Sequence, residues 1–141
     1  MSNVRQLCTF FLDGLHFGVD VKYVQEVTCY QEMTPVPLAS PVVRGLMNLR
    51  GQIVTALDMR RRLERPDRSS EDEPMNVVIC TDDGLVSLIV DEIGDVVEVD
   101  ERTYERPPET LRGAARELIQ GAYTVDGRLL LMLNSERAVQ V

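Results

Sequence analysis

Residues 76–90 read NVVICTDDGLVSLIV, two β-prone runs on either side of an Asp-Gly pair. Such a pair favours a tight turn between antiparallel strands, because glycine readily adopts the positive φ that these turns need. The same pattern occurs twice more, around Asp13-Gly14 and around Asp126-Gly127. The three pairs predict three β-hairpins, and the expected fold class is therefore all-β with a few short helices.

Shorter elements are expected between the hairpins. Two further strands are predicted at 52–57 and 95–99, where β-branched residues are frequent. Single helical turns are predicted at 21–25, from Ser40 to about Met47, at 59–63 after Asp58 as a cap, and at 135–139. Pro107-Pro108 predicts an extended linker before any helix near residue 113.

A weak internal repeat relates residues 11–27 to residues 83–96, since each copy carries an Asp-Gly turn, an apolar run and a second short strand. The repeat is consistent with two small β units of similar design. They are divided by the charged stretch 60–74, which we interpret as a helix end followed by a mobile loop. Its arginines are read as solvated side chains rather than as a site for RNA or acidic lipid, because acids follow them at once and no aromatics interleave.

Length and composition exclude several classes of protein. The 141 residues are 44% hydrophobic and 27% charged, which permits one globular domain or two very small ones. No apolar run approaches the length of a membrane span, and no secretory signal begins the chain. The net charge of -8 disfavours binding to nucleic acid, whose phosphates attract basic surfaces.

The residues that usually carry catalysis are few. His16 is the one histidine, and we expect a strand residue that faces solvent or caps a barrel. Cys8, Cys29 and Cys80 are widely spaced and indicate a reducing compartment, and all three are predicted to be small buried hydrophobes. No spacing predicts a metal site or a phosphate loop.

One alternative from another class stays open. Asp91, Glu92 and Asp95 cluster around one strand start, so a small enzyme or ligand-binding β-barrel could use these carboxylates. That alternative predicts a deep polar pocket with perturbed carboxylates, whereas a binding module predicts a shallow apolar groove.

Residues 41–54, PVVRGLMNLRGQIV, are harder to explain as core alone. Two Arg-Gly pairs bracket an apolar turn, and Gly51 suits a sharp entry into the following strand. Arg50 would then be presented from rigid backbone, either to a partner or to a nearby carboxylate in a purely structural pair.

At this segment the chain resembles the CheW family, the scaffold proteins of bacterial chemotaxis. The resemblance covers nearly the whole chain, and its Asn-Leu-Arg-Gly element at 48–51 is highly specific. The blocks that carry it are FGVDV at 17–21, VQEV at 24–27, VRGLMNLRGQIV at 43–54, LDMR at 57–60 and VDEIGDV at 90–96.

The resemblance implies two SH3-like five-stranded β-barrels packed together. It predicts a single CheW-like domain over residues 1–141, made of two intertwined barrel subdomains, one at about residues 15–75 and one formed by the remainder. It also implies that the protein is not an enzyme, needs no cofactor or metal, and is cytoplasmic and recruited to membrane-associated chemoreceptor arrays. Membrane insertion and nucleic acid are not part of the implied function.

The implied function is an adaptor that couples chemoreceptors, the methyl-accepting chemotaxis proteins, to the histidine kinase CheA. Its partners would be the helical signalling tip of the receptor, the regulatory domain of CheA, and further copies of the adaptor in rings. By position, the receptor groove would contain Arg50, its salt-bridge partner Glu26, the apolar residues Val24, Val27 and Val96, and the wall glycines Gly45 and Gly51. The kinase surface would contain Met33, Thr34, Val36 and Val42.

Two further expectations concern departures and alternatives. Thr110 stands where a bulkier apolar residue would help a ring-closing contact with the kinase, and Tyr104 is the candidate to compensate. Within the same fold, the alternative function is an adaptor for a chemosensory pathway that controls type IV pili or biofilm.

Overall fold

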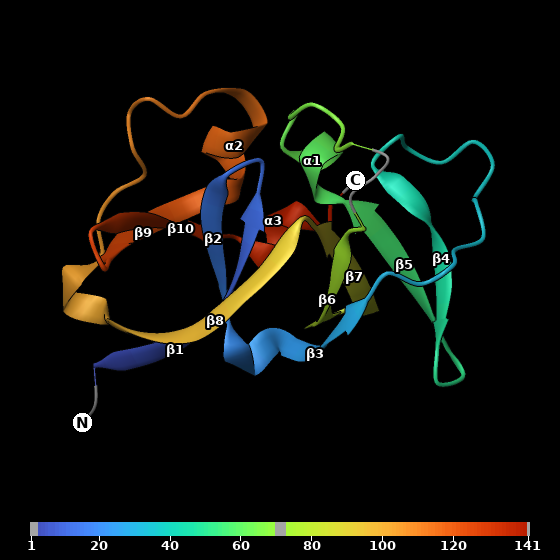
Figure 1. Ribbon diagram of the computed structural model, residues 1–141, viewed down its shortest axis with the longest axis horizontal. Coiled ribbons are helices and arrows are strands. Elements are labelled where there is room, and N and C mark those ends of the chain that lie inside the picture. The colour runs from blue at the N-terminus through green and yellow to red at the C-terminus, as the bar shows by residue number, and fades with distance from the viewer. Residues whose placement is uncertain (1–2, 70–72, 141) are drawn as a thin grey trace.

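The computed structural model describes residues 3–69 and 73–140, which form two five-stranded sheets side by side (Figure 1). We name the sheets by the part of the chain that forms them: the flanking sheet uses the two ends of the chain, and the central sheet uses the middle. The flanking sheet, on the left of Figure 1, has the order β8-β1-β2-β10-β9, with β1 (Val4–Leu12), β2 (Leu15–Asp20), β8 (Glu92–Asp100), β9 (Ile119–Val125) and β10 (Arg128–Leu133). The central sheet, on the right, has the order β3-β6-β7-β5-β4, with β3 (Val24–Cys29), β4 (Val43–Leu49), β5 (Gln52–Asp58), β6 (Met75–Thr81) and β7 (Gly84–Val90). The all-β fold class is confirmed.

The three predicted hairpins are present as β1–β2, β6–β7 and β9–β10. A fourth hairpin joins β4 to β5 through Arg50 and Gly51, which both have positive φ, 50° and 88°. The helical turn predicted from Ser40 to about Met47 is wrong, because residues 43–49 form strand β4 instead. Their burial alternates along the strand, so pairing with β5 and packing of one face outweigh the helix-start signal of Ser40.

The sheets divide the chain differently from the expected boundary at about residues 15–75. The central sheet uses one continuous segment, from Val24 to Val90, and the flanking sheet uses the segments on both sides of it. Strand β2 lies in the flanking sheet because it pairs with both β1 and β10. The hairpin β6–β7 lies in the central sheet because it pairs with β3 and β5.

The weak sequence repeat corresponds to a repeat of topology. Each sheet has a central hairpin (β1–β2 or β6–β7), a parallel neighbour (β10 or β5) and an antiparallel edge strand (β8 or β3). Each edge strand follows directly on the hairpin of the other sheet, since β2 leads into β3 and β7 leads into β8. The two units are therefore intertwined, and β3 and β8 are equivalent strands.

Three apolar clusters hold the sheets. The largest lies between the sheets and includes Phe10, Phe17, Ile79 and Leu88. A second cluster lies on the other face of the flanking sheet, around Tyr123. A third lies on the other face of the central sheet and consists of Met47, Leu49, Val54 and Val78, with Met33 and Leu85 against them. Each sheet thus has its own core and shares one with its neighbour.

The helices are short: η1 (Val21–Tyr23), α1 (Met59–Arg62), η2 (Glu101–Thr103), α2 (Gly113–Leu118) and α3 (Ser135–Ala138). The turns predicted at 21–25, 59–63 and 135–139 are confirmed as η1, α1 and α3, whereas η2 was not predicted. The cap predicted for α1 is confirmed, because Oδ1 of Asp58 accepts hydrogen bonds from the backbone N–H groups of Arg60 and Arg61. No helix in the described part of the chain is long and apolar enough to cross a membrane.

The arginines of α1 and of the segment after it are more ordered than predicted. The interpretation as solvated side chains is wrong for Arg60 and Arg68, whose side chains are only 14% and 13% exposed. Both donate hydrogen bonds to the carboxylate of Asp91, at the junction of β7 and β8. Of the acids that follow in the same stretch, Glu71 and Asp72 lie outside the described residues.

The prediction of three buried cysteines holds only for Cys8. Cys29 and Cys80 are exposed. Cys29 is the last residue of β3, and Cys80 is the next-to-last residue of β6, so both lie near strand ends, where fewer side chains cover them.

Candidate functional site

The most distinctive feature of the surface is a fixed arginine at the tip of the β4–β5 hairpin. Arg50 Nη1 donates to Glu26 Oε1 at 2.5 Å and Arg50 Nη2 donates to Glu26 Oε2 at 2.7 Å. The Arg50 side chain is 74% exposed, whereas that of Glu26 is 18% exposed. The hydrogen bonds from Arg50 to Glu26 raise the pKa of the guanidinium. The pair joins the β4–β5 turn, at one edge of the central sheet, to β3 at the other edge, and it fixes the direction of the cation.

The turn that carries Arg50 is itself held in place. Asn48 Oδ1 accepts a hydrogen bond from the backbone N–H of Gly51 at 2.8 Å. Arg50 and Gly51 both take the left-handed conformation, which glycine adopts without strain. The Asn-Leu-Arg-Gly element therefore forms a tight turn in which the asparagine braces the backbone beside the arginine.

Two exposed valines occupy equivalent positions on the edge strands β3 and β8. Val27 pairs with Val77, and Val96 pairs with Cys8. Residues paired across neighbouring strands point to the same side of a sheet, and Val77 and Cys8 both belong to the cluster between the sheets. Val27 and Val96 therefore point toward the space between the sheets, where they remain 38% and 60% exposed.

Val24 extends this apolar surface inward. It is half-buried and packs against the cluster between the sheets. The chain bulges between Val24 and Glu26, which turns Glu26 toward the face of its partner Val78 rather than toward the space between the sheets. One strand thus presents apolar side chains on one face and the anchoring carboxylate on the other.

The two glycines of the expected groove wall have different surroundings. Gly51 lies in the turn beside Arg50, where a Cβ would meet no atom within 4 Å. At Gly45, which has a φ of 156°, a Cβ would lie 2.7 Å from the carbonyl oxygen of Thr34 and 3.1 Å from Cβ of Met33. Gly45 therefore contacts the expected kinase surface, not the arginine.

The four residues of the expected kinase surface lie on the connection between β3 and β4. Thr34 forms a two-way bridge with Leu46, with both N···O distances 2.8 Å, and Met33 packs against the core of the central sheet. The carbonyl of Val42 accepts from the backbone N–H of Asp58 at 2.8 Å. Val36 is exposed between these anchors.

Two exposed apolar residues near these surfaces were missed by sequence reasoning. Ile53 is 65% exposed and immediately follows the turn that carries Arg50. The alternation of β5 gives a signal for it, since Ile53 precedes the buried Val54. Leu38 is fully exposed in the β3–β4 connection, and the sequence carries no periodic signal there.

The carboxylate cluster does not form the reactive pocket that an enzyme would need. Glu92 and Asp95 are exposed, while Asp91 is bound by Arg60, Arg68 and the backbone N–H of Asp13. Burial raises the pKa of Asp91, but the hydrogen bonds from Arg60 and Asp13, with Arg68, outweigh it and the net pKa is lowered. The carboxyl is held ionised, which suits a structural ion pair rather than proton transfer.

His16 is a half-buried residue of β2, paired with Phe11 and Leu130 on the neighbouring strands. Its ring stacks on Phe11, with 4.6 Å between centroids, and its Nδ1 is buried. Burial and the charge of Arg128 both lower its pKa, so the neutral form is favoured. Among the residues that the structure describes, no group of histidine, cysteine or carboxylate side chains is arranged to hold a metal ion.

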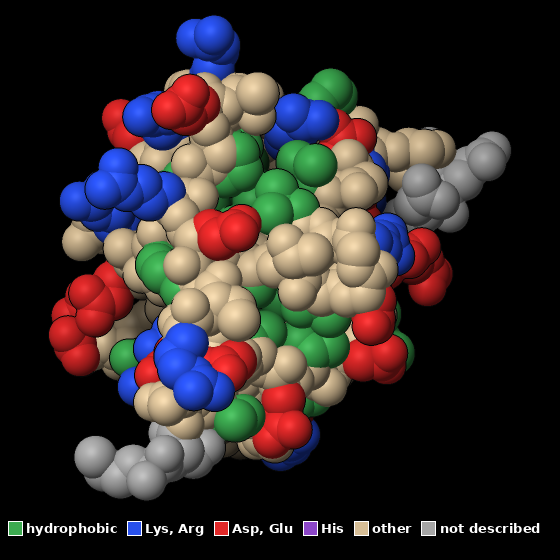
Figure 2. Space-filling view, turned by 90° about the vertical axis from the view of Figure 1, so that its left-hand side faces the viewer, with side chains coloured by type: hydrophobic (Ala, Val, Ile, Leu, Met, Phe, Trp, Pro, Cys, Tyr) green, Lys and Arg blue, Asp and Glu red, His purple; other side chains and the backbone are tan. Residues whose placement is uncertain are grey.

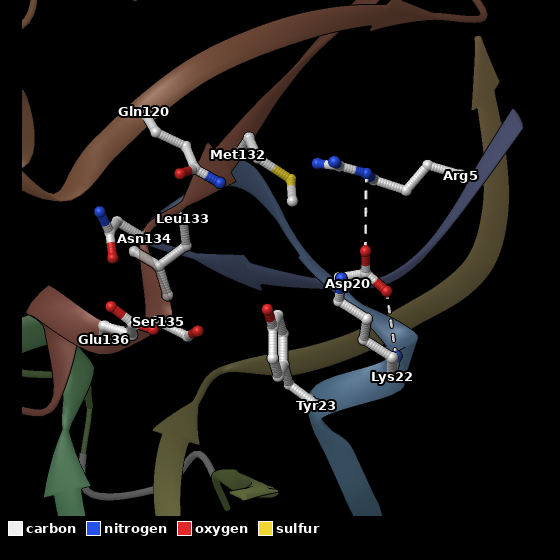
Figure 3. Close-up of a pocket in the computed structure, with 10 residues that line it drawn as sticks. All are labelled: Arg5, Asp20, Lys22, Tyr23, Gln120, Met132, Leu133, Asn134, Ser135 and Glu136. Atoms are coloured by element: carbon white, nitrogen blue, oxygen red, sulfur yellow. Dashed lines mark hydrogen bonds and ion pairs between the residues drawn. The ribbon is translucent and has the colours of Figure 1, made fainter. Parts of the chain in front are cut away.

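A small cleft of about 290 Å³ lies between η1, the start of β1 and the β10–α3 junction (Figure 3). Its charged groups are largely satisfied within the chain. Arg5 pairs with Asp20 and Glu101, and the ammonium of Lys22 lies 5.1 Å from the centre of the Tyr23 ring. The cleft is therefore a charge-balanced depression.

The two residues considered for a ring-closing contact, Tyr104 and Thr110, lie on the connection between η2 and α2. Tyr104 donates a hydrogen bond to the carbonyl of Gln120 and meets Tyr123 edge to face, while Thr110 is exposed. Figure 2 views the molecule from the side of the flanking sheet and shows several apolar patches separated by acidic and basic side chains.

One family model and two relatives match most of the chain. The family model of the CheW-like domain matches residues 6–141. The chain is 30% identical over 131 residues to the chemotaxis protein CheW of Bacillus subtilis (strain 168), covering 93% of this chain and 84% of that protein. It is 29% identical over 133 residues to the chemotaxis protein CheW of Treponema pallidum (strain Nichols), covering 92% and 78%.

A solved structure has the same fold. The crystal structure of the scaffolding protein TtCheW from Thermoanaerobacter tengcongensis superposes with a TM-score of 0.86 and 24% identity, over 97% of this chain and 93% of that chain. The agreement covers both sheets and their connections, since so little of either chain lies outside it.

Proposed function

Since the chain belongs to the CheW family of non-catalytic chemotaxis scaffold proteins, we propose that it couples chemoreceptors to the histidine kinase CheA. In this role it contacts the helical signalling tip of a receptor through one surface and the regulatory domain of CheA through another. The observation that carries the proposal is Arg50, an exposed cation whose direction is fixed by two hydrogen bonds to Glu26.

The receptor surface combines this cation with apolar side chains. Val27 and Val96, with Val24 behind them, supply contact area for an amphipathic helix on the side between the sheets. Arg50 supplies a charge at the hairpin tip, where the bidentate pair leaves little side-chain freedom to lose on binding. Gly51 allows the tight turn, and Gly45 supports the neighbouring segment.

The kinase surface is the β3–β4 connection. Met33 and Val42 anchor it to the central sheet, and Thr34 and Val36 are exposed for contact. This surface lies on the same sheet as Arg50 but on a separate loop, so one small protein can hold both partners.

The proposed role also specifies where the protein works in the cell and how its domain is organised. The protein works in the cytoplasm at receptor arrays. Further copies of it can join the array through contacts between equivalent barrels. We treat the chain as one domain of two intertwined barrels, with residues 24–90 as the unit that carries both Arg50 and the kinase surface.

Binding measurements with isolated partners test the proposal. A receptor signalling-tip fragment and the CheA regulatory domain are immobilised separately, and the purified protein is titrated onto each. We expect both to bind, and Arg50→Ala to weaken receptor-tip binding about tenfold, since a charge-assisted contact of the expected size is lost.

Arg102→Ala is the matched control. The Arg102 side chain is also 74% exposed and also makes a multiple contact with one carboxylate, that of Asp100, but it lies on η2 in the flanking unit. Receptor-tip binding should be unchanged in this variant. If the wild-type protein does not bind the receptor tip, or does not bind the regulatory domain of CheA, the proposal is overturned.

A further inference from the structure

Leu38 has a backbone conformation that disfavours its own side chain. Its φ is +64°, and it follows Pro37 in a turn closed by a hydrogen bond from the Ala39 N–H to the Val36 carbonyl at 3.4 Å. Proline followed by a residue with positive φ is the arrangement of a type II turn, whose third position favours glycine or asparagine. A leucine there is strained by its Cβ.

No contact of Leu38 within the chain compensates for this backbone strain. Leu38 as a whole residue is 106% exposed, so it is as open to water as in an extended peptide and buries almost no apolar surface. The other non-glycine residues with positive φ are polar or charged: Asp13, Arg50, Glu64 and Asp126. Asp13, Arg50 and Asp126 lie in hairpin turns, and Arg50 is also fixed by Glu26. Leu38 alone among these described residues combines positive φ with a large exposed apolar side chain.

The loop holds this leucine in a fixed position. The Val43 N–H donates to the Ser40 carbonyl at 2.9 Å, and Arg61 Nη1 donates to the Pro41 carbonyl at 3.0 Å. Prolines at 35, 37 and 41 restrict the backbone further. Because the backbone of the loop is already held, little backbone entropy is lost when this side chain enters a pocket.

We propose that Leu38 is the apolar anchor of the kinase surface and inserts into an apolar pocket of the CheA regulatory domain. The inference rests on the proposed function, because the partner is assigned by continuity: Leu38 lies in the same turn as Val36 and four residues before Val42. Backbone strain that no contact within a protein explains is a recognised mark of a functional position.

The test separates binding from folding in one variant. Leu38→Asn removes the apolar side chain and introduces a residue that tolerates positive φ. We expect affinity for the CheA regulatory domain to fall about 10- to 100-fold, the effect of burying one leucine side chain. The melting temperature should stay equal to or exceed that of the wild type, because strain is relieved.

Two control variants accompany it. Leu38→Met keeps a flexible apolar side chain and should retain most of the affinity. Leu129→Asn removes another exposed apolar residue, 43% exposed on β10, and should leave kinase binding unchanged. Binding of all variants to the receptor tip should equal that of the wild type.

The outcomes are distinct. If the wild type binds the regulatory domain and Leu38→Asn binds equally well, the anchor is refuted while the proposed function stands. If Leu38→Asn lowers the melting temperature, Leu38 is a structural residue and the anchor is also refuted. If the wild type does not bind the regulatory domain at all, the kinase arm of the proposed function fails and the anchor fails with it.

Discussion

Arg60 donates to both oxygens of Asp91, with N···O distances of 2.9 Å from Nε and 2.6 Å from Nη2, and so ties helix α1 to the strand junction that leads into β8. Asp91 also receives a hydrogen bond from the backbone N–H of Asp13, in the turn of the first hairpin. One carboxylate therefore joins the two sheets beside their shared core.

Arg60→Ala should destabilise the protein, because it leaves the partly buried Asp91 with fewer partners. The expected loss in the free energy of unfolding is about 2 kcal/mol, the size of hydrogen bonds to a charged group. Urea unfolding measures it. Arg102→Ala, which breaks an exposed pair, should leave the curve nearly unchanged, and equal losses in the two variants would refute a special role for the inter-sheet pair.

Acid should weaken the same pair. The pKa of Asp91 is lower in the folded protein than its ordinary value of about 3.9, so its contribution to stability is present above that value and is lost as the pH falls through the folded pKa. Wild type and Asp91→Asn should therefore differ most in free energy of unfolding at neutral pH. The difference should narrow below about pH 4; a constant difference down to pH 2 would contradict the assignment.

Gly45→Ala should displace the kinase segment from β4. Its Cβ would lie 2.7 Å from the carbonyl oxygen of Thr34, which must move, and its φ of 156° adds strain. We expect a loss of about 2 kcal/mol and faster hydrogen exchange at the Thr34 and Leu46 amides. Gly14→Ala, where a Cβ meets open space, is the control and should leave those two amides protected.

Thiol titration should distinguish the cysteines. Cys29 and Cys80 are exposed and should react with a thiol reagent in the native protein, whereas Cys8 is buried and burial raises its pKa. Two fast thiols and one that reacts only after denaturation are expected. Three fast thiols would show that the core around Cys8 is open.

Local chemistry was enough to predict much of the fold. The Asp-Gly turns specify three hairpins because the preference for positive φ is a property of adjacent residues, and Asp58 caps α1 for the same local reason. Strand β4 was missed because its Ser-Pro start resembles a helix cap, and the decisive factor, pairing with β5, comes from residues further along the chain.

Long-range pairing explains the other differences. The boundary between the units depends on which hairpin each edge strand joins, and nothing in β2 or β7 marks that its successor crosses to the other sheet. Arg60 and Arg68 were read as solvated because their acceptor, Asp91, is distant in the sequence, 31 residues from Arg60 and 23 from Arg68. Leu38 was overlooked for a different reason: its positive φ comes from the turn in which it lies, and leucine itself does not favour that conformation.

The candidate site was predictable only in part. The resemblance placed Arg50 beside Glu26, and the structure brings the two side chains together. It also placed Gly45 with the groove, whereas Gly45 contacts Met33 and Thr34. The exposed Ile53 next to this turn came only from the structure.

Kinase activity in a reconstituted mixture tests the central claim most directly. CheA autophosphorylation is measured with receptor signalling fragments, first without this protein and then with the wild type, Arg50→Ala or Arg102→Ala. The proposed coupling predicts that the wild type and Arg102→Ala raise kinase activity and that Arg50→Ala does so far less. Activity that is the same with and without the wild-type protein would contradict the claim that it couples receptor to kinase.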